Sequence, residues 1–222
     1  MSFILSFETS TPTCSVALHK DGRLLGIKNI HAEKSHSGSL VPMTQDLLEE
    51  HGLKIKDLAA VAVSEGPGSY TGLRISTSTA KGICFATEIP LIAVGTMPAM
   101  AEEMKGKCAF AVPMLDARRM EVYTQVFGPE VVSDPLAMVL DENSYQEYLP
   151  ADSEVLFFGS GAEKYKAICK FNNAKFDTDF VPSANGIGVL AWEKFQQKQF
   201  EDVAYFEPFY LKEFYTTAKK IF

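Results

Sequence analysis

Hydrophobic and polar residues alternate in three short segments near the start of the chain. Residues Ile4 to Phe7 form an apolar run rich in β-formers, Thr13 to Leu18 alternate with a period of two, and Arg23 to Ile30 do so more loosely. The pair Asp21-Gly22, between the last two segments, is typical of a tight hairpin turn. The pattern therefore predicts an opening meander of three strands.

A helical period then alternates with continuous apolar runs. One face of the first predicted helix, at about 38–51, carries the apolar residues Leu40, Met43, Leu47 and Leu48, and Gly52 is expected to end it. Two buried strands follow, and each leads into a helix. In order, these elements are a strand at 59–63, a helix at 71–86, a strand at 91–94 and a helix from 96 to about 105.

The same mixture begins again in the second half of the chain. Strands are predicted at 109–115, 121–127 and 155–158, and a helix at 183–196, whereas the aromatic segment 206–222 is expected to be only partly regular. No internal repeat is visible in the residues themselves. The order of elements predicts an α/β protein of two lobes, 1–104 and 105–222, each a mixed sheet with flanking helices. A single mixed α/β domain is the alternative.

Charge and cysteine usage limit the possible functions. The 222 residues carry a net charge of −7, and neither half of the chain is basic, so the chain is not expected to hold nucleic acid by itself. The four cysteines form no CxxC pair, which is typical of a reducing, cytoplasmic compartment. No membrane helix or N-terminal signal sequence is expected.

Two polar turns are candidates for a nucleotide site. Glu8, Thr9 and Thr11 follow the first strand, where a carboxylate and hydroxyls can hold a phosphate or a metal-bound water. Gly159 and Gly161 follow a later strand, and a turn of this kind can face an adenosine. The alternative for both is a structural turn whose polar groups bond to their own backbone.

The loop at 65–72 is rich in glycine and leads into the helix at 71–86. It contains Gly66, Pro67, Gly68, Ser69, Tyr70, Thr71 and Gly72. It matches neither a Walker A nor a GxGxxG pattern, so we interpret it as a loop that determines shape. Small residues make the helix after it thin, and this helix can pack either on its own sheet or against a partner's helix.

Metal and nucleophile chemistry find little support in the sequence. The four histidines lack the i, i+4 spacing of a helical metal pair, and no GxSxG elbow occurs. No metal site is expected. The turn Asp116-Ala117-Arg118-Arg119 can bind an anion, but a turn that satisfies its own polar groups is the favoured alternative.

Taken together and in order, these segments resemble the TsaB (YeaZ) family, whose members are similar to the ASKHA, ribonuclease H-like folds of actin, hexokinase and Hsp70. The residues that carry the resemblance are the opening strand–turn–strand at 4–18, His36-Ser37, Gly66 to Arg74 with Ala80-Lys81-Gly82, Asp116-Ala117-Arg118 with Glu121-Val122-Tyr123, and Pro208, Tyr210 and Leu211. The chain departs from the usual pattern at Glu8, Tyr70 and Lys212, where Asp, Phe and Arg are more common.

The resemblance implies a role in making threonylcarbamoyladenosine beside the tRNA anticodon, as a non-catalytic scaffold and activator. The implied partners are a TsaD-like catalytic subunit, a TsaE-like ATPase and a second copy of the chain, with tRNA contacted only through the complex. No cofactor of its own is implied, because ATP is used by the assembled complex. The two helices of the first lobe are implied to dock the partner, through Leu40, Met43, Leu47, Arg74, Thr77, Ser78 and Lys81.

Two other functions compete with this interpretation. One is an actin-like kinase or ATPase that acts alone through the two polar turns. The other is a peptidase of the glycoprotease type, for which no nucleophile, base or metal ligands can be named.

Overall fold

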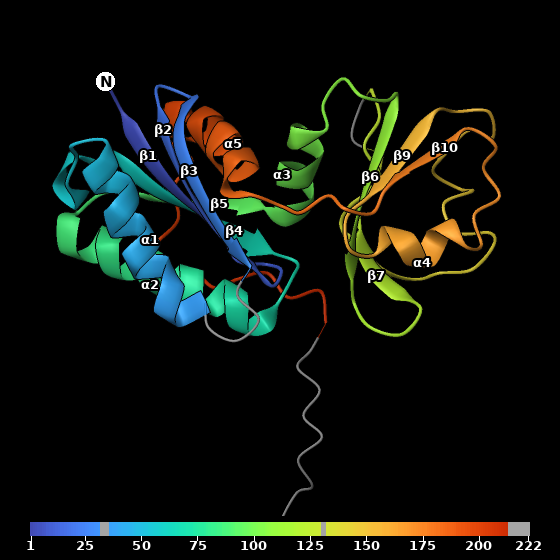
Figure 1. The fold of residues 1–222 in the computed structure, drawn as a ribbon, viewed down its shortest axis with the longest axis horizontal. Helices are drawn as coiled ribbons and strands as arrows, with labels where there is room; N and C mark the ends of the chain where they lie inside the picture. The colour runs from blue at the N-terminus through green and yellow to red at the C-terminus, as the bar shows by residue number, and fades with distance from the viewer. Residues whose placement is uncertain (32–35, 130–131, 213–222) are drawn as a thin grey trace, which may run out of the picture.

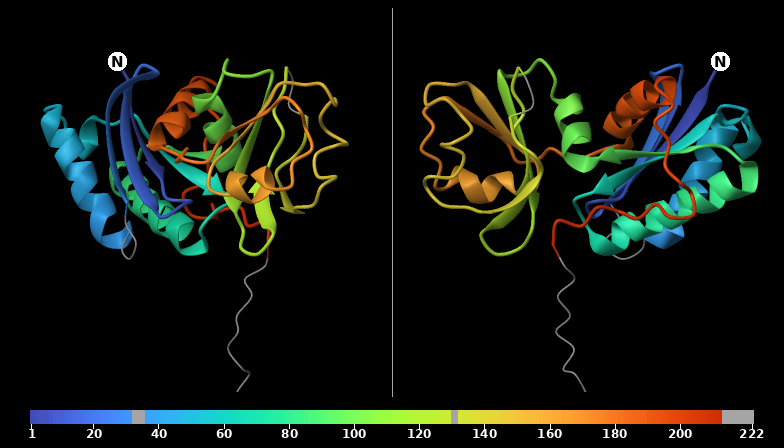
Figure 2. Two further views of the ribbon diagram at one scale, coloured as in Figure 1. Left: turned by 45° about the vertical axis from the view of Figure 1, so that its right-hand side comes forward. Right: turned by 180° about the vertical axis from the view of Figure 1, so that it is seen from behind.

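A computed structural model describes residues 1–31, 36–129 and 132–212 of the chain. Two lobes lie side by side, each built around one sheet (Figures 1 and 2). Both sheets contain five strands. The expectation of two α/β lobes, each with a mixed sheet, is therefore confirmed.

The sheet of the first lobe has the order β3-β2-β1-β4-β5. Its strands are β1 (Phe3–Glu8), β2 (Thr13–Lys20), β3 (Arg23–His31), β4 (Ala60–Gly66) and β5 (Leu91–Gly95). The first three strands pair antiparallel, as their tight turns require, and β4 and β5 run parallel to β1. This arrangement brings the carboxyl ends of β1 and β4 together, and the polar turn and the glycine loop follow those ends.

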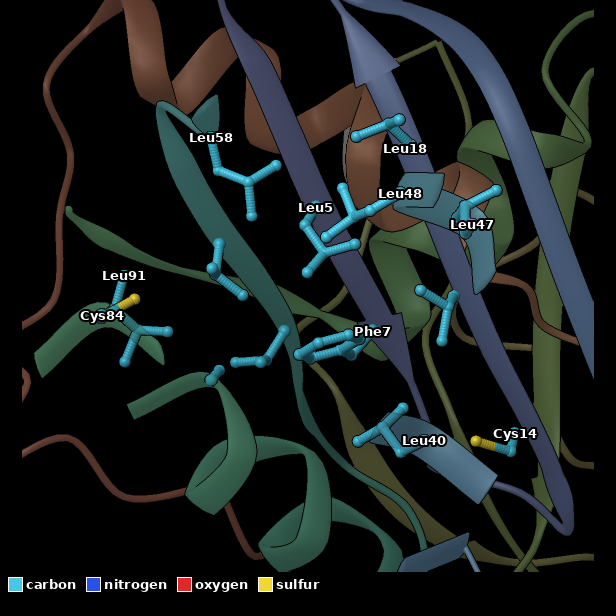
Figure 3. Packing of buried hydrophobic residues seen from close by; sticks show 14 residues of the cluster. Leu5, Phe7, Cys14, Leu18, Leu40, Leu47, Leu48, Leu58, Cys84 and Leu91 are labelled. Carbon is cyan, nitrogen blue, oxygen red and sulfur yellow. The ribbon is translucent and has the colours of Figure 1, made fainter. Parts of the chain in front are cut away.

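Helices α1 (His36–Glu50) and α2 (Tyr70–Thr87) cover one face of this sheet (Figure 1). Their inward side chains pack on strand residues such as Leu5, Phe7 and Val16, all fully buried (Figure 3). The short 3₁₀ helix η1 (Ile55–Asp57) leads from α1 to β4. Burial of this apolar face, at about 25 cal/mol per Å², is the main force that holds the two helices in place.

The second sheet has the order β10-β9-β6-β7-β8. Its strands are β6 (Phe110–Asp116), β7 (Glu121–Thr124), β8 (Leu136–Val139), β9 (Val155–Phe158) and β10 (Ala174–Asp177), and helix α4 (Ala162–Lys166) follows β9. Strands β6 to β8 pair antiparallel, and β9 and β10 run parallel to β6. The second sheet thus repeats the topology of the first, although the residues show no repeat.

Helices α3 (Thr96–Glu103) and α5 (Ala184–Gln196) pack on each other where the lobes meet (Figure 2). Methionines of α3, among them Met97 and Met100, lie against Leu115 and Phe158 of the second sheet. Helix α5 returns to the first sheet, where Ile187 packs on its strands. The division at 104/105 separates the two sheets in sequence, but α5 packs on the sheet of the first part.

The C-terminal segment 200–212 crosses the first lobe as a strap without helix or strand. Glu201 forms a bridge to Leu91, and the backbone N–H of Phe209 donates to the carbonyl of Glu65 at 2.7 Å. The described part of 206–222 therefore has little regular structure, as expected. Residues 213–222 lie outside the described part of the chain.

Candidate functional site

An open groove of about 400 Å³ lies on the helical face of the first lobe. Its lining comes almost wholly from α2, with one residue from the start of α1. These residues are Ser37, Tyr70, Thr71, Arg74, Ile75, Ser78 and Thr79. The spacing of Arg74 and Ser78, one helical turn apart, places both on one face of α2. The groove is therefore a shallow surface that an elongated partner element can cover.

Tyr70 and Arg74 make a rigid polar corner at the N-terminal end of this groove. The Arg74 guanidinium donates to the Tyr70 hydroxyl at 2.6 Å and lies 4.9 Å from the centre of the Tyr70 ring. The Tyr210 ring of the strap lies 4.9 Å from the same ring. These contacts hold Arg74 in one place and reduce the side-chain entropy that a partner must overcome.

Two of the seven residues implied as docking residues, Arg74 and Ser78, are exposed and line the groove. Met43 is half-buried and packs against the core. Lys81 is also half-buried, and its ammonium donates to the backbone carbonyls of Ala204 and Phe206. Lys81 therefore holds the strap on α2.

The other three implied docking residues, Leu40, Leu47 and Thr77, are buried inside the first lobe. Leu40 and Leu47 belong to the cluster that joins α1 to the sheet (Figure 3). They lie on the apolar side of an amphipathic helix, and that side faces the chain's own core. They lie beneath the exposed face of α1 and α2 and offer no surface to a partner in this conformation.

Two exposed apolar side chains on the same helices were missed from the sequence. Phe85, at the C-terminal end of α2, is 83% exposed, and Val41 of α1 is 47% exposed. Large exposed aromatic residues are common anchors of protein interfaces. The helical period could have predicted the exposure of Phe85, because this residue lies two turns beyond Ser78 on the outer face of α2.

The loop at 66–72 is fixed by close contact between backbones. A Cβ on Gly68 would lie 2.4 Å from Cβ of Ser10, and one on Gly72 would lie 1.9 Å from the Thr9 carbonyl oxygen. Gly66 has a φ of +113°, and Ser69 caps α2 by accepting from the N–H of Gly72. The glycines let the loop press against the turn after β1.

The polar turn after β1 is buried and mostly satisfied from within the lobe. The Thr9 hydroxyl donates to the Gly72 carbonyl at 2.8 Å and lies 2.8 Å from Oγ of Ser76. Oγ1 of Thr11 accepts from the N–H of Thr13 at 3.3 Å. The hydroxyls therefore bond to this lobe's own loop and backbone, as the structural alternative expects.

Glu8 is the acidic residue of this turn, and it is buried. Its Oε1 accepts from the N–H of Ser10 at 2.5 Å, but its buried Oε2 has no hydrogen-bond partner among the described residues. Burial raises the pKa of the Glu8 carboxyl, and hydrogen bonds from Ser10 only partly offset this rise. Burial therefore disfavours the charged form of the carboxyl, the form that a divalent cation would need.

Gly159 and Gly161 occupy tightly packed positions of the second lobe. Their N–H groups donate to the carbonyls of Asp177 and Met114, at 3.0 and 2.9 Å. A Cβ on Gly161 would lie 2.6 Å from Cγ1 of Val122. Both N–H donors are therefore used within the lobe. Nucleotide binding by the two polar turns stays a prediction.

Within the described ranges, no group of three or more His, Cys, Asp or Glu side chains is placed to hold a metal ion. Buried His19 contacts Asn185 of α5, with 3.2 Å between Nε2 and Oδ1. The side chain of His36 lies outside the described part of the structure. In the same ranges, no helix combines the length and apolar composition that crossing a bilayer requires.

Comparison with known proteins identifies relatives over nearly the whole chain. The family model described as TsaD, tRNA N6-adenosine threonylcarbamoyltransferase, matches residues 15–221. The tRNA threonylcarbamoyladenosine biosynthesis protein TsaB of Escherichia coli is 29% identical over 94% of each chain, and TsaB of Bacillus subtilis is 31% identical over 73% of each. The solved structure of YeaZ from Pseudomonas aeruginosa is 26% identical, with a TM-score of 0.84 over 95% of this chain and 100% of that one.

Proposed function

Because this chain belongs to the TsaB family, we propose that it is a non-catalytic scaffold and activator in tRNA threonylcarbamoyladenosine biosynthesis. The proposed catalytic partner is a TsaD-type subunit, which transfers the threonylcarbamoyl group to the adenosine beside the anticodon. A TsaE-type ATPase completes the proposed complex, and tRNA is contacted only in that assembly. The cytoplasm is the proposed location.

The observation that carries the proposal is the open groove on α2, in which Arg74 is held by its contacts with Tyr70. Phe85 is exposed two turns beyond Ser78 on the same helix. A helical face with small residues between a fixed cation and an aromatic anchor suits another helix pair. A stable interface buries about 1,200 Å² or more in total, so both helices take part. A second copy of the chain can use the same face when the partner is absent.

The polar turns support the non-catalytic part of the proposal. The Thr9 hydroxyl and the N–H groups of Gly159 and Gly161 donate within the chain, and Glu8 is buried with a raised pKa. We therefore propose that the chain carries no nucleotide of its own and that ATP is handled by the assembled complex. An actin-like ATPase acting alone is the second candidate, and strong binding of ATP with magnesium by the isolated chain would favour it.

Ser78→Arg tests the docking face directly. A long charged side chain in the middle of a close helix contact is expected to weaken pairing with the TsaD-type partner at least about tenfold, or about 1.4 kcal/mol. Titration calorimetry measures this change. Gln196→Arg, on the exposed end of α5, is the matched control and is expected to leave the affinity unchanged. Equal affinities for both variants would remove Ser78 from the interface.

A further inference from the structure

The hairpin turn between β6 and β7 exposes two consecutive arginines at the lower end of the second lobe (Figure 1). Arg118 has a φ of +70° and Arg119 a φ of +50°. Residues other than glycine, asparagine and aspartate rarely adopt this left-handed region, at a cost of about 1–2 kcal/mol each. An Asn-Gly pair would fit this backbone better, so the turn itself does not select arginine.

The acids of the turn are already neutralised by other groups. Oδ1 of Asp116 accepts from the N–H of Arg118 and from the ammonium of Lys164, both at 2.6 Å. The Glu121 carboxylate pairs with Lys212 of the strap. Four cations therefore face two acids here, a local surplus of two positive charges in a chain whose net charge is −7.

Both guanidinium groups remain available to a ligand. Among the residues that the structure describes, no carboxylate lies within ion-pair distance of Arg118 or Arg119. The one large apolar side chain exposed in the turn is Met120, and this is too little for the apolar centre that a protein interface needs. A planar guanidinium, in contrast, fits a phosphate with two parallel hydrogen bonds.

We propose that Arg118 and Arg119 contact the phosphodiester backbone of the tRNA substrate in the assembled complex. The inference rests on the proposed function, because the acidic chain has too few cations to hold RNA by itself. Contacts of this kind set the position of the nucleic acid and carry no base specificity. The hairpin thus adds up to two phosphate contacts to those made by the other subunits.

The double variant Arg118→Asn/Arg119→Gly tests the proposal without endangering the fold, since Asn and Gly favour the positive φ of these positions. Fluorescence anisotropy with labelled unmodified tRNA, at several salt concentrations, compares complexes that contain the wild-type or the variant chain. The variant complex is expected to bind several-fold more weakly. The plot of log affinity against log salt has a negative slope, and the magnitude of this slope is expected to decrease by about 1 to 2.

Three controls make the result decisive. The variant chain should melt at or above the wild-type temperature. The charge-matched double variant Arg23→Gln/Lys56→Gln, which removes two exposed cations of the first lobe, should change neither affinity nor slope. Size-exclusion chromatography should show that the variant complex assembles.

Unchanged affinity and slope in the intact variant complex would overturn the inference. Failure of the variant to assemble would also overturn it and assign the turn to a protein partner. The proposed function fails separately, if modification proceeds equally well without the wild-type chain.

Discussion

Gly72 lies where the turn after β1 and the first turn of α2 touch backbone to backbone, and no side chain fits between them. Gly82, ten residues further along the same helix, has open space in the direction of a Cβ. Two glycines of one helix therefore have opposite roles. The first is required by packing, and the second costs helix stability.

Gly72→Ala is expected to lower the free energy of unfolding by about 3 kcal/mol, because the new Cβ would overlap the Thr9 carbonyl oxygen. Gly82→Ala is expected to raise it by roughly 0.5–1 kcal/mol. Urea titration of both variants measures these changes. An unchanged free energy of unfolding in Gly72→Ala would show that the loop and the turn do not pack as described.

Glu8 makes stability depend on pH. Burial raises its pKa above 4.5, so between 4.5 and the folded-state pKa the folded protein binds more protons than the unfolded chain. The contribution of Glu8 to the free energy of unfolding therefore falls as the pH rises through this range. Glu8→Gln is expected to be more stable than wild type at pH 7, with a difference that shrinks toward pH 4.

Thermal unfolding at several pH values tests this prediction. The exposed residue Glu49 supplies the matched control, because Glu49→Gln makes the same change of side chain without a buried carboxylate. A Glu8→Gln variant that is less stable than wild type at pH 7 would show that the carboxylate has a binding partner in solution.

At the scale of elements, the strap contacts α2 beside the groove and also reaches the second lobe. Lys81 holds its backbone on α2, Tyr210 stacks on Tyr70 beside the groove, and Lys212 pairs with Glu121 of the second lobe. The segment has no regular hydrogen-bonded structure of its own, so these side chains largely determine its path.

Lys81→Met is expected to loosen the strap, because two backbone carbonyls lose a charged donor. A local loss of about 1 kcal/mol would speed hydrogen exchange at the Phe209 amide, which bonds to Glu65, roughly fivefold. Exchange at the amides of β1 in the same sample should be unaffected. The control variant Lys56→Met, at an exposed lysine of η1, should leave exchange at Phe209 unchanged. Unchanged exchange at Phe209 would show that the strap is held without the Lys81 contacts.

The sequence predicted the long elements well and the short ones poorly. Helices α1 and α2 and strands β1 to β5 have clear periods and turn signals, and all were predicted. Strands β8 and β10 were missed, because each has four residues and is only partly buried. A helix after the turn at 159–162 was expected without bounds, and α4 lies there. The predicted strand at 121–127 ends at Thr124, and Phe127 forms only an isolated bridge.

The residues implied to dock a partner lie on α1 and α2, and docking itself stays a prediction, but their exposure could not be predicted from spacing. An apolar residue on an amphipathic helix belongs either to the core or to a partner, and spacing does not separate the two for Leu40 and Leu47. Their burial and the exposure of Phe85 required the packed structure. The role of Lys81 depends on a strap more than a hundred residues away in sequence, which local patterns do not show.

At the scale of the molecule, two sheets of the same topology present different surfaces. The groove on α2 lies on the first lobe, and the arginine turn lies at the lower end of the second (Figure 1). Several polar groups of the two candidate nucleotide turns bond to the protein itself. These surfaces are the ones on which the proposed scaffold role depends.

Reconstitution of tRNA modification tests this account most directly. The assay contains unmodified tRNA, the threonylcarbamoyl-adenylate intermediate, and the TsaD-type and TsaE-type subunits with ATP, with this chain added or left out. We predict that modification requires the chain and that the chain alone neither modifies tRNA nor hydrolyses ATP. Equal modification without the chain, or ATP turnover by the chain alone, would contradict the scaffold role.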